Sequence, residues 1–346
     1  MITTELQKVK KFVAKDYKNE NNVRWCPGCG DHALLSCLHR AMAELGIEPY
    51  KTAVISGIGC SSRLPYYMNT YGFHTIHGRA AAIATGVKVA NPKLNVWVVT
   101  GDGDSLAIGG NHFIHAVRRN IDLNIILLNN KIYGLTKGQY SPTSDRGFVS
   151  KTSPYGTVED PFRPAELCFG ARGKFFARAI DVDMKNATKA LAAASKHKGT
   201  SVTEILQNCV IFNDGIHNKI VDRSWKADRT ILLEQDEKMI FGANKDKGIV
   251  LDGWNLKAVT IDGEEGYTLD DVLVHDATTK DSTLHLKLAL MGAEDDLPVA
   301  LGIIRDVDAP TYDEEYCKQI EEVQKKHPKK SFEEFLMSSS NLWEVK

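Results

Sequence analysis

Between residues 52 and 210, short apolar runs alternate with segments in which apolar side chains recur at helical spacing. The apolar runs are TAVISGIG, NVWVVTG, LNIILLNN, KFFARAID and TSVTEILQN. Runs of this length that end in turn residues are typical of buried strands. Strands that alternate with helices predict an α/β fold built on a parallel sheet with right-handed crossovers.

The helical spacing predicts four helices, over residues 31–45, 79–90, 105–119 and 184–196. Asp31 can cap the first helix, whose apolar residues fall on one stripe. The second stops at Asn91 and Pro92, because a residue before proline disfavours the helical conformation. The last ends before Gly199.

Two other regions lack this alternation. Residues 131–164 are rich in Gly, Ser, Thr, Pro and Tyr without periodicity, so we expect a long loop of the kind that is commonly functional or disordered. After Asp214 the chain is charged and rich in turns, with strand candidates KAVTID, LHLKLAL and VALGII and a charged helical tail. We therefore divide the chain into a main domain, residues 1–214, and a smaller C-terminal extension, residues 215–346, without recognisable chemistry.

Composition narrows the class of protein. With 346 residues, of which 43% are hydrophobic, the chain can bury a large core. Its 43 Lys and Arg residues nearly balance 44 Asp and Glu residues, so no net charge favours nucleic acid or a membrane surface as a partner. The first twenty residues lack the apolar stretch of a signal peptide, and no run of about 18 apolar residues predicts a membrane span. We expect a cytoplasmic protein.

Seven cysteines in a reducing compartment leave metal binding, catalysis or simple burial as their roles. The CPGC stretch, Cys26 to Cys29, can be a metal clip, a redox dithiol or a pair of buried thiols. Thiolates are soft ligands that suit zinc or iron-sulfur clusters, and two other thiols, those of Cys60 and Cys209, can complete a set of four. We interpret the remaining three, Cys37, Cys168 and Cys317, as structural.

Polar and thiol side chains follow four of the predicted strands. Cys60, Asp102, the pair Asn129 and Asn130, and Cys209 each stand at the carboxyl end of a different apolar run. In a parallel sheet these ends share one edge, where ligands bind. The sequence therefore predicts one site at this edge.

The GDG stretch adds a phosphate and metal signal to that edge. Gly101 and Gly103 let the backbone approach a phosphate closely, and Asp102 offers a hard oxygen ligand for Mg²⁺. One crossover later, Asn130 can supply a second oxygen to the same ion. A dinucleotide-binding loop is the rival interpretation, but Leu106 stands where its third glycine is required.

Six stretches together carry a family resemblance: CPGCG, GIGCSSR, HGRAAAIATG, GDGDSLAIGG, LLNNKIYGLTKGQYSPTS and ILQNC. Over roughly Trp25 to Asp214, the chain resembles the β subunit of 2-oxoacid:ferredoxin oxidoreductases, most closely the 2-oxoglutarate type. The resemblance implies the diphosphate-binding half of a thiamine diphosphate fold. It also implies oxidative decarboxylation of a 2-oxoacid to an acyl-coenzyme A, with electrons passing through a 4Fe-4S cluster to ferredoxin.

The resemblance also implies roles for individual residues. Cys26, Cys29, Cys60 and Cys209 would bind the cluster, while Asp102, Asn130 and the carbonyl of Ile132 would hold Mg²⁺. The thiamine diphosphate contacts would be Ile58, Gly59, Cys60, Ser61, Gly101, Gly103, Asp104, Gly134 and Leu135. His77 would be a further cofactor contact or a structural residue. Lys137 corresponds to a position linked to coenzyme A, and Arg63 and Leu135 to positions linked to substrate selection.

Partners and alternatives follow from what the chain lacks. Thiamine enzymes need a glutamate against the aminopyrimidine, and we find no second α/β domain to hold it, so we expect an α subunit in an αβ or (αβ)₂ assembly. Pyruvate or broad 2-oxoacid specificity stays open, as does binding of coenzyme A phosphates by Arg63. The alternatives are a cluster-free thiamine diphosphate decarboxylase or synthase, and a zinc-stabilised binding protein.

Overall fold

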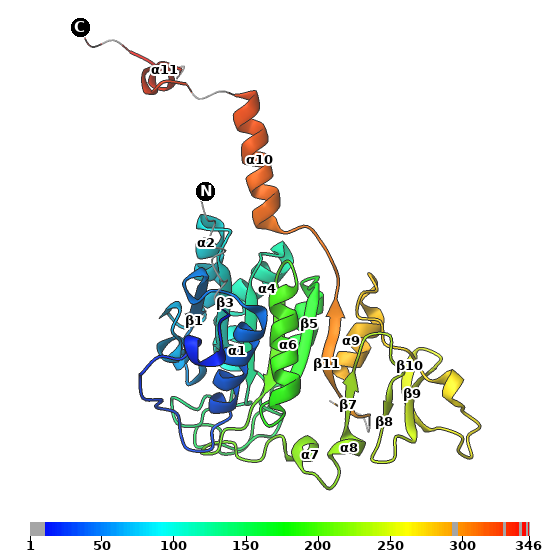
Figure 1. Cartoon of the computed structure of the whole chain (residues 1–346). Coiled ribbons are helices and arrows are strands. Elements are labelled where there is room, and N and C mark those ends of the chain that lie inside the picture. Colours follow the sequence, from blue (N-terminus) through cyan, green and yellow to red (C-terminus); the bar gives the residue numbers. More distant parts are fainter. Residues whose placement is uncertain (1–10, 293–296, 328–329, 339–340, 344, 346) are drawn as a thin grey trace, which may run out of the picture.

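The computed structural model describes residues 11–292, 297–327, 330–338, 341–343 and 345. Its main sheet has eight strands in the order β2-β1-β3-β4-β6-β5-β11-β7 (Figure 1). The first ten residues, part of the segment in which no signal peptide is expected, lie outside the described residues. The strands of this sheet are β1 (Thr52–Ser56), β2 (Tyr71–His74), β3 (Asn95–Gly101), β4 (Asn124–Asn129), β5 (Phe175–Ile180), β6 (Ser201–Leu206), β7 (Thr230–Leu233) and β11 (Val299–Asp306).

The six strands from β2 to β5 in this order are parallel, which confirms the predicted α/β sheet. All five apolar runs form strands at the predicted places. The sixth strand, β2, was not predicted because all four of its residues are exposed at the sheet edge and give no apolar run. At the other end, β11 is antiparallel to β5 and parallel to β7.

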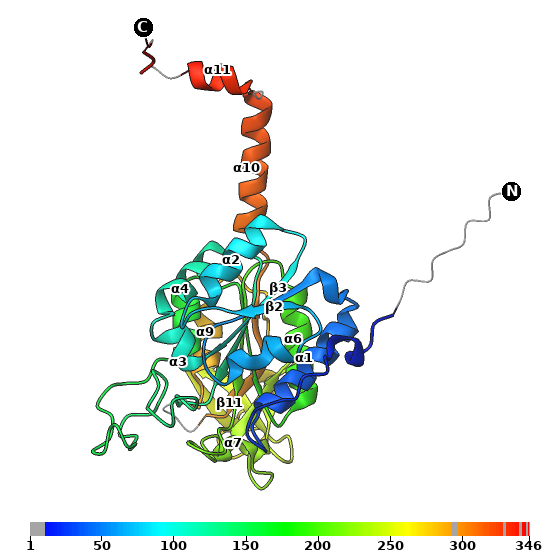
Figure 2. The same ribbon diagram turned by 90° about the vertical axis from the view of Figure 1, so that its left-hand side faces the viewer.

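Helices cover both faces of the sheet, as Figure 2 shows. One face packs against α1 (Asp31–Leu45) and α6 (Met184–Lys196), and the other against α2 (Ala80–Ala90), α4 (Gly110–Arg119), α5 (Pro164–Gly170) and α9 (Thr283–Leu290). Successive strand residues alternate between the two core clusters, since Val96 and Val98 pack on the α2 side while Trp97 and Val99 pack on the α1 side. The sheet is therefore buried on both faces, as parallel sheets are.

The predicted helix over residues 105–119 is wrong as a single helix. It is split into α3 (Asp102–Leu106) and α4 by a break at residues 107–109. The break brings Gly109 against Gly78, where a Cβ on Gly109 would lie 2.3 Å from the carbonyl oxygen of Asp104. Close backbone packing, which only glycine permits, wins here over helix continuity.

Two smaller predictions are also wrong. LHLKLAL is not a strand but part of α9. The spacing of Leu284 and Leu288 fits one turn of a helix as well as one face of a strand, and leucine favours helices. Asp31 does not cap α1 but occupies its first helical position and is buried. The N-cap residue is Gly30. Glycine is needed at this position because a Cβ would lie 2.1 Å from the carboxylate of Asp181.

The C-terminal extension adds β7 and β11 to the main sheet. The other two strands predicted there are confirmed, because VALGII lies in β11 and most of KAVTID lies in β10. It also forms a small antiparallel sheet of β8 (Ile240–Phe241), β9 (Lys247–Asp252) and β10 (Asn255–Thr260), and two short helices, α7 (Asn218–Val221) and α8 (Lys226–Arg229). The charged tail forms α10 (Tyr312–Lys326) and α11 (Phe332–Met337), which extend away from the body (Figures 1 and 2). Among the described residues, no helix has both the length and the apolar character needed to cross a membrane.

Candidate active site

A pocket with a volume of about 60 Å³ opens at the carboxyl ends of β1, β3, β4 and β6, and we call it the rim pocket. It lies at the end of the sheet opposite to α10 (Figure 1). It is lined by Ile58, Gly59, Cys60, Ser61, His77, Gly101, Asp102, Gly103, Asp104, Leu128, Asn130, Ile132, Tyr133, Gly134, Leu135, Thr136 and Gln207. The structure thus brings together most of the predicted site residues, which come from segments far apart in the sequence.

The carboxylate of Asp102 is buried at the start of α3, directly after β3. Its Oδ2 accepts hydrogen bonds from the hydroxyls of Ser141 and Thr143, each at 2.6 Å. Burial raises the pKa of Asp102, although both hydroxyls act in the opposite direction. No Lys, Arg or His in the described part of the chain forms an ion pair with this carboxylate. A divalent cation fits this setting, because it would compensate the buried charge.

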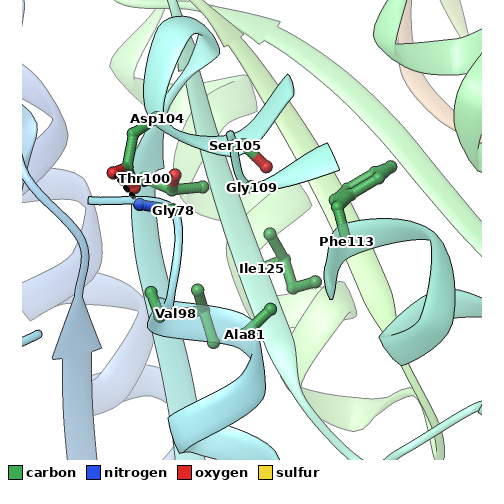
Figure 3. Close-up of a pocket in the computed structure, with 10 residues that line it drawn as sticks. Gly78, Ala81, Val98, Thr100, Asp104, Ser105, Gly109, Phe113 and Ile125 are labelled. Carbon is green, nitrogen blue, oxygen red and sulfur yellow. Dashed lines mark hydrogen bonds between the residues drawn. The ribbon is translucent and has the colours of Figure 1, made fainter. Parts of the chain in front are cut away.

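Asp104 has a different role, because its carboxylate points back into the protein. Its Oδ1 accepts the backbone N–H groups of Ile58 at 3.0 Å and Gly78 at 2.7 Å, and its Oδ2 accepts the hydroxyl of Thr100 at 2.7 Å. Figure 3 shows this carboxylate between Thr100 and the Gly78 backbone. A Cβ on Gly57 would lie 1.8 Å from Oδ2, so glycine is required there. Asp104 therefore fixes two loops that border the rim pocket.

Tyr133 packs over the GDG turn. Its hydroxyl donates to the carbonyl of Gly103 at 3.0 Å, and burial together with the charges of Asp102 and Asp104 raises its pKa to about 12. A Cβ on Gly103 would lie 2.2 Å from this ring. The ring of His77 lies 6.2 Å from that of Tyr133, and its Nδ1 is 3.6 Å from Asp104. His77 lines the pocket, and in the described part of the chain its Nδ1 has no hydrogen-bond partner.

The four thiols of Cys26, Cys29, Cys60 and Cys209, which we call the four-thiol site, gather beside the rim pocket. A Cβ on Gly134 would lie 3.5 Å from the sulfur of Cys209 and 3.7 Å from that of Cys60. The CPGC turn reaches them through the indole N–H of Trp25, which donates to the carbonyl of Cys60 at 2.7 Å. Gly28 approaches Val210, next to Cys209, with the positive φ of 84° that glycine favours. Four separate positions in the chain therefore converge.

The chemistry of these thiols bears on which metal they can hold. Within the described residues, no three His, Cys, Asp or Glu side chains are arranged to hold one metal ion. Thiolates are soft ligands that suit both zinc and iron-sulfur clusters, so the donor set by itself fits either group. Burial raises the pKa of Cys29, and it raises that of Cys60 to about 11 with help from Asp31, Cys209 and Cys26. Metal binding would therefore release protons.

Some predicted residues lie elsewhere. Arg63 and Lys137 do not line the rim pocket, although the positive charge of Arg63 reaches Cys60 and partly offsets the rise in the pKa of this thiol. Lys137 is exposed in a turn after Gly134. Cys37 and Cys168 are buried in the two core clusters, as predicted for structural thiols.

Comparison with known proteins decides the family. Residues 57–205 match the family described as "Thiamine pyrophosphate enzyme, C-terminal TPP binding domain". A 2-oxoglutarate oxidoreductase subunit from Mycobacterium tuberculosis is 47% identical over 88% of this chain and 81% of its own length. The chain belongs to the β subunits of the 2-oxoacid:ferredoxin oxidoreductases.

Other relatives agree with this assignment of the β subunit. A 2-oxoglutarate synthase subunit from Archaeoglobus fulgidus is 49% identical over 54% of this chain and 69% of its own. A solved structure, described as a 2-oxoglutarate:ferredoxin oxidoreductase from Magnetococcus marinus with 2-oxoglutarate, coenzyme A and succinyl-CoA bound, superposes with a TM-score of 0.76. It is 33% identical and covers 96% of this chain and 98% of its own. The chain is thus an enzyme subunit with a thiamine diphosphate-binding domain.

Sequence reasoning missed several residues of this β subunit that the geometry brings into the site. Ser141 and Thr143 reach Asp102 from the long loop, which has no periodic signal, although they lie in the stretch that carries the resemblance. Tyr133 and Gln207 line the rim pocket. The signal for Gln207 was its place two residues before Cys209, in the ILQNC stretch.

Proposed function

We propose that this β subunit binds thiamine diphosphate, Mg²⁺ and a 4Fe-4S cluster and catalyses oxidative decarboxylation of a 2-oxoacid, principally 2-oxoglutarate, to the acyl-coenzyme A. Ferredoxin would take the electrons. The observation that carries the proposal is that the four-thiol site and the carboxylate of Asp102 border the same pocket. A cofactor that loses electrons and a cluster that accepts them must be close neighbours for electron transfer.

Asp102, Asn130 and the carbonyl of Ile132 would hold Mg²⁺ against the diphosphate. All three residues line the rim pocket. The buried carboxylate of Asp102, which has no cationic side-chain partner among the described residues, supports this assignment, as does the turn at Gly103, where a side chain would collide with Tyr133. Ile58, Gly59, Ser61, Gly101, Asp104, Gly134 and Leu135 would contact the cofactor, with Asp104 acting mainly through the loops it holds.

Cys26, Cys29, Cys60 and Cys209 would bind the cluster. When bound, thiamine diphosphate supplies the electron sink for loss of carbon dioxide, and a 4Fe-4S cluster supplies one-electron acceptance. The residues of this chain bind and orient both groups. Four soft sulfur ligands beside the rim pocket support a cluster over zinc, because zinc has no redox chemistry with which to accept electrons.

We further propose that the chain works with an α subunit that carries the pyrimidine-binding domain and its glutamate. The described residues contain one main parallel sheet, and that sheet supplies the diphosphate side of the site. The names of the relatives as β subunits support a partner. The isolated chain should therefore be inactive towards 2-oxoglutarate, and full activity without a partner would contradict this.

Arg63 would contribute to substrate choice by pairing with the distal carboxylate of 2-oxoglutarate, which pyruvate lacks, while Lys137 would contact coenzyme A. The charge of Arg63 reaches the pocket edge at Cys60, which supports the assignment. A charge-assisted contact contributes about 1.5–3 kcal/mol. Arg63→Ala should therefore lower kcat/KM for 2-oxoglutarate by about tenfold or more relative to pyruvate. Arg146→Ala, an exposed arginine paired with Asp160, is the control, and an unchanged preference in Arg63→Ala would exclude this role.

Anaerobic purification of the chain with its partner subunit tests the whole proposal. We expect a brown protein with iron, labile sulfide and bound thiamine diphosphate. Cys209→Ser should lose iron and sulfide, whereas Cys168→Ser, at a buried thiol in the core, should keep them. A colourless protein that holds thiamine alone would indicate a cluster-free decarboxylase, and one that holds zinc would indicate a zinc-stabilised binding protein.

A further inference from the structure

A chain of hydrogen bonds links the Mg²⁺ side of the rim pocket to the four-thiol site. The backbone N–H of Ile132 donates to Oδ1 of Asn130 at 3.2 Å, and Nδ2 of Asn130 donates to Oε1 of Gln207 at 2.8 Å. Nε2 of Gln207 in turn donates to the sulfur of Cys29 at 3.3 Å and to the carbonyl of Asn208 at 2.9 Å. One side chain, Gln207, therefore contacts a proposed ligand of each inorganic group.

The donors and acceptors in this chain fix the direction of both amides. A backbone N–H can only donate, so the atom of Asn130 that faces Ile132 must be its oxygen. The amide nitrogen of Asn130 then faces Gln207, which must answer with its own oxygen. The remaining amide nitrogen of Gln207 is thereby directed at Cys29. The contact with sulfur is a consequence of the chain of bonds rather than of a freely rotating group.

Gln207 is also held rigidly. It directly follows β6, its backbone N–H donates to the carbonyl of Asn129 at 3.0 Å, and only 1% of the residue is exposed. Gly30 at the start of α1 packs so closely that a Cβ there would lie 2.8 Å from Cγ of Gln207. A buried side chain with both ends bonded has little freedom, so its N–H stays aimed at the sulfur.

We propose that Gln207 is a positioning residue that sets the reduction potential of the cluster and at the same time orients Asn130 towards Mg²⁺. This inference rests on the proposed function. Reduction adds one negative charge to a cluster and its thiolates, and an N–H donor at a ligating sulfur stabilises the reduced form more than the oxidised form. Gln207 therefore raises the potential, while its oxygen keeps Oδ1 of Asn130 turned towards the metal.

Two substitutions separate the two ends of the side chain. Gln207→Met is of similar length and removes both bonds. Gln207→Glu keeps an acceptor for Nδ2 of Asn130, but an ionised carboxylate cannot donate to sulfur. Gln235→Met is the control, because Gln235 is exposed and bonds to Asp236 and Asp276, outside the residues that line the rim pocket.

The measurement is an anaerobic redox titration of the complete enzyme, followed by the electron paramagnetic resonance signal of the reduced cluster. Both Gln207 variants should shift the one-electron reduction equilibrium at least tenfold towards the oxidised form, which is 59 mV. Gln235→Met should match the wild type. The affinity for Mg²⁺ in the presence of thiamine diphosphate should fall in Gln207→Met and be retained in Gln207→Glu.

The outcomes distinguish this inference from the function beneath it. A wild-type enzyme without iron and sulfide would overturn the proposed function and the inference with it. A wild type that carries the cluster, with unchanged potentials in both Gln207 variants, would overturn the inference alone. Loss of the cluster from both variants would also overturn it, because a residue that only tunes and orients can be replaced without loss of the four thiolate ligands.

Discussion

Replacement of Asp104 tests how strongly one buried carboxylate holds the rim pocket together. Asp104→Ala leaves the N–H groups of Ile58 and Gly78 and the hydroxyl of Thr100 without their acceptor. A buried polar group without a partner costs about 1–3 kcal/mol. Because the Thr100 hydroxyl can turn to the carbonyl of Gly101, two N–H groups lose their acceptor, and we expect the free energy of unfolding to fall by about 2–6 kcal/mol.

Asp104→Asn is a finer perturbation at the same position. The amide oxygen can still accept from Ile58 and Gly78, and the amide nitrogen can donate to the oxygen of Thr100. Only the charge assistance is lost, so we expect a cost of about 2 kcal/mol. Thiamine diphosphate should also bind Asp104→Ala more weakly than Asp104→Asn, because the loops at Ile58 and Gly78 border the pocket.

Urea unfolding of the purified chain, followed by tryptophan fluorescence, measures these differences. The control is Asp145→Ala, which removes an exposed carboxylate paired with Lys131 at 2.7 Å. Such surface pairs contribute less than about 1 kcal/mol. A difference in the free energy of unfolding of less than about 1 kcal/mol between Asp104→Ala and Asp145→Ala would be no larger than the value of one exposed pair. Such a result would refute the assignment of Asp104 as the residue that fixes both loops.

Three further perturbations follow from buried groups, each measured by urea unfolding. Gly103→Ala should lower the free energy of unfolding by about 1–3 kcal/mol, because its Cβ would lie 2.2 Å from the ring of Tyr133. Tyr133→Phe removes only the hydrogen bond to Gly103 and should lower it by about 1 kcal/mol. Equal losses in the two variants would contradict the steric argument. Arg178→Met should lower the free energy of unfolding by about 3–5 kcal/mol, because the buried carboxylate of Glu204 loses the guanidinium that donates to it at 2.7 Å. A loss below about 1 kcal/mol would show that water reaches this carboxylate. Burial lowers the pKa of His39 to about 4, so below pH 6.5 the unfolded chain binds more protons than the folded chain. The free energy of unfolding should therefore fall by about 3 kcal/mol between pH 6.5 and 4. His39→Leu should reduce this dependence on pH, and an unchanged dependence would assign the loss to other groups.

The edge of the sheet could be predicted because it depends on a simple rule. Parallel strands end at one rim, so placing Asp102, Asn130 and Cys60 directly after apolar runs was sufficient to bring them to one pocket. The CPGC turn lies before the first strand of the sheet, and its place beside Cys60 depends on the contact through Trp25. That placement came from chemistry and family resemblance, not from the pattern of elements.

The contacts that the sequence did not reveal are long-range or concern exposed residues. The hydroxyls of Ser141 and Thr143 reach Asp102 across a loop whose path is set by tertiary packing. The alternation in LHLKLAL has a period of two by coincidence, and packing of Leu288 in the core decides for a helix. The helix break at Gly109 depends on the approach of Gly78, which is too far away in the sequence for local helix propensity to register.

The position of β11 has a consequence for synthesis of the protein. This strand is the last of the described strands to leave the ribosome, yet it lies inside the main sheet between β5 and β7. A nascent or truncated chain that ends before Val299 leaves the edge of β5 without its hydrogen-bonding neighbour, and such open edges recruit strands from other molecules. Until Val299–Asp306 pairs with β5, a newly made chain therefore carries an aggregation-prone sheet edge.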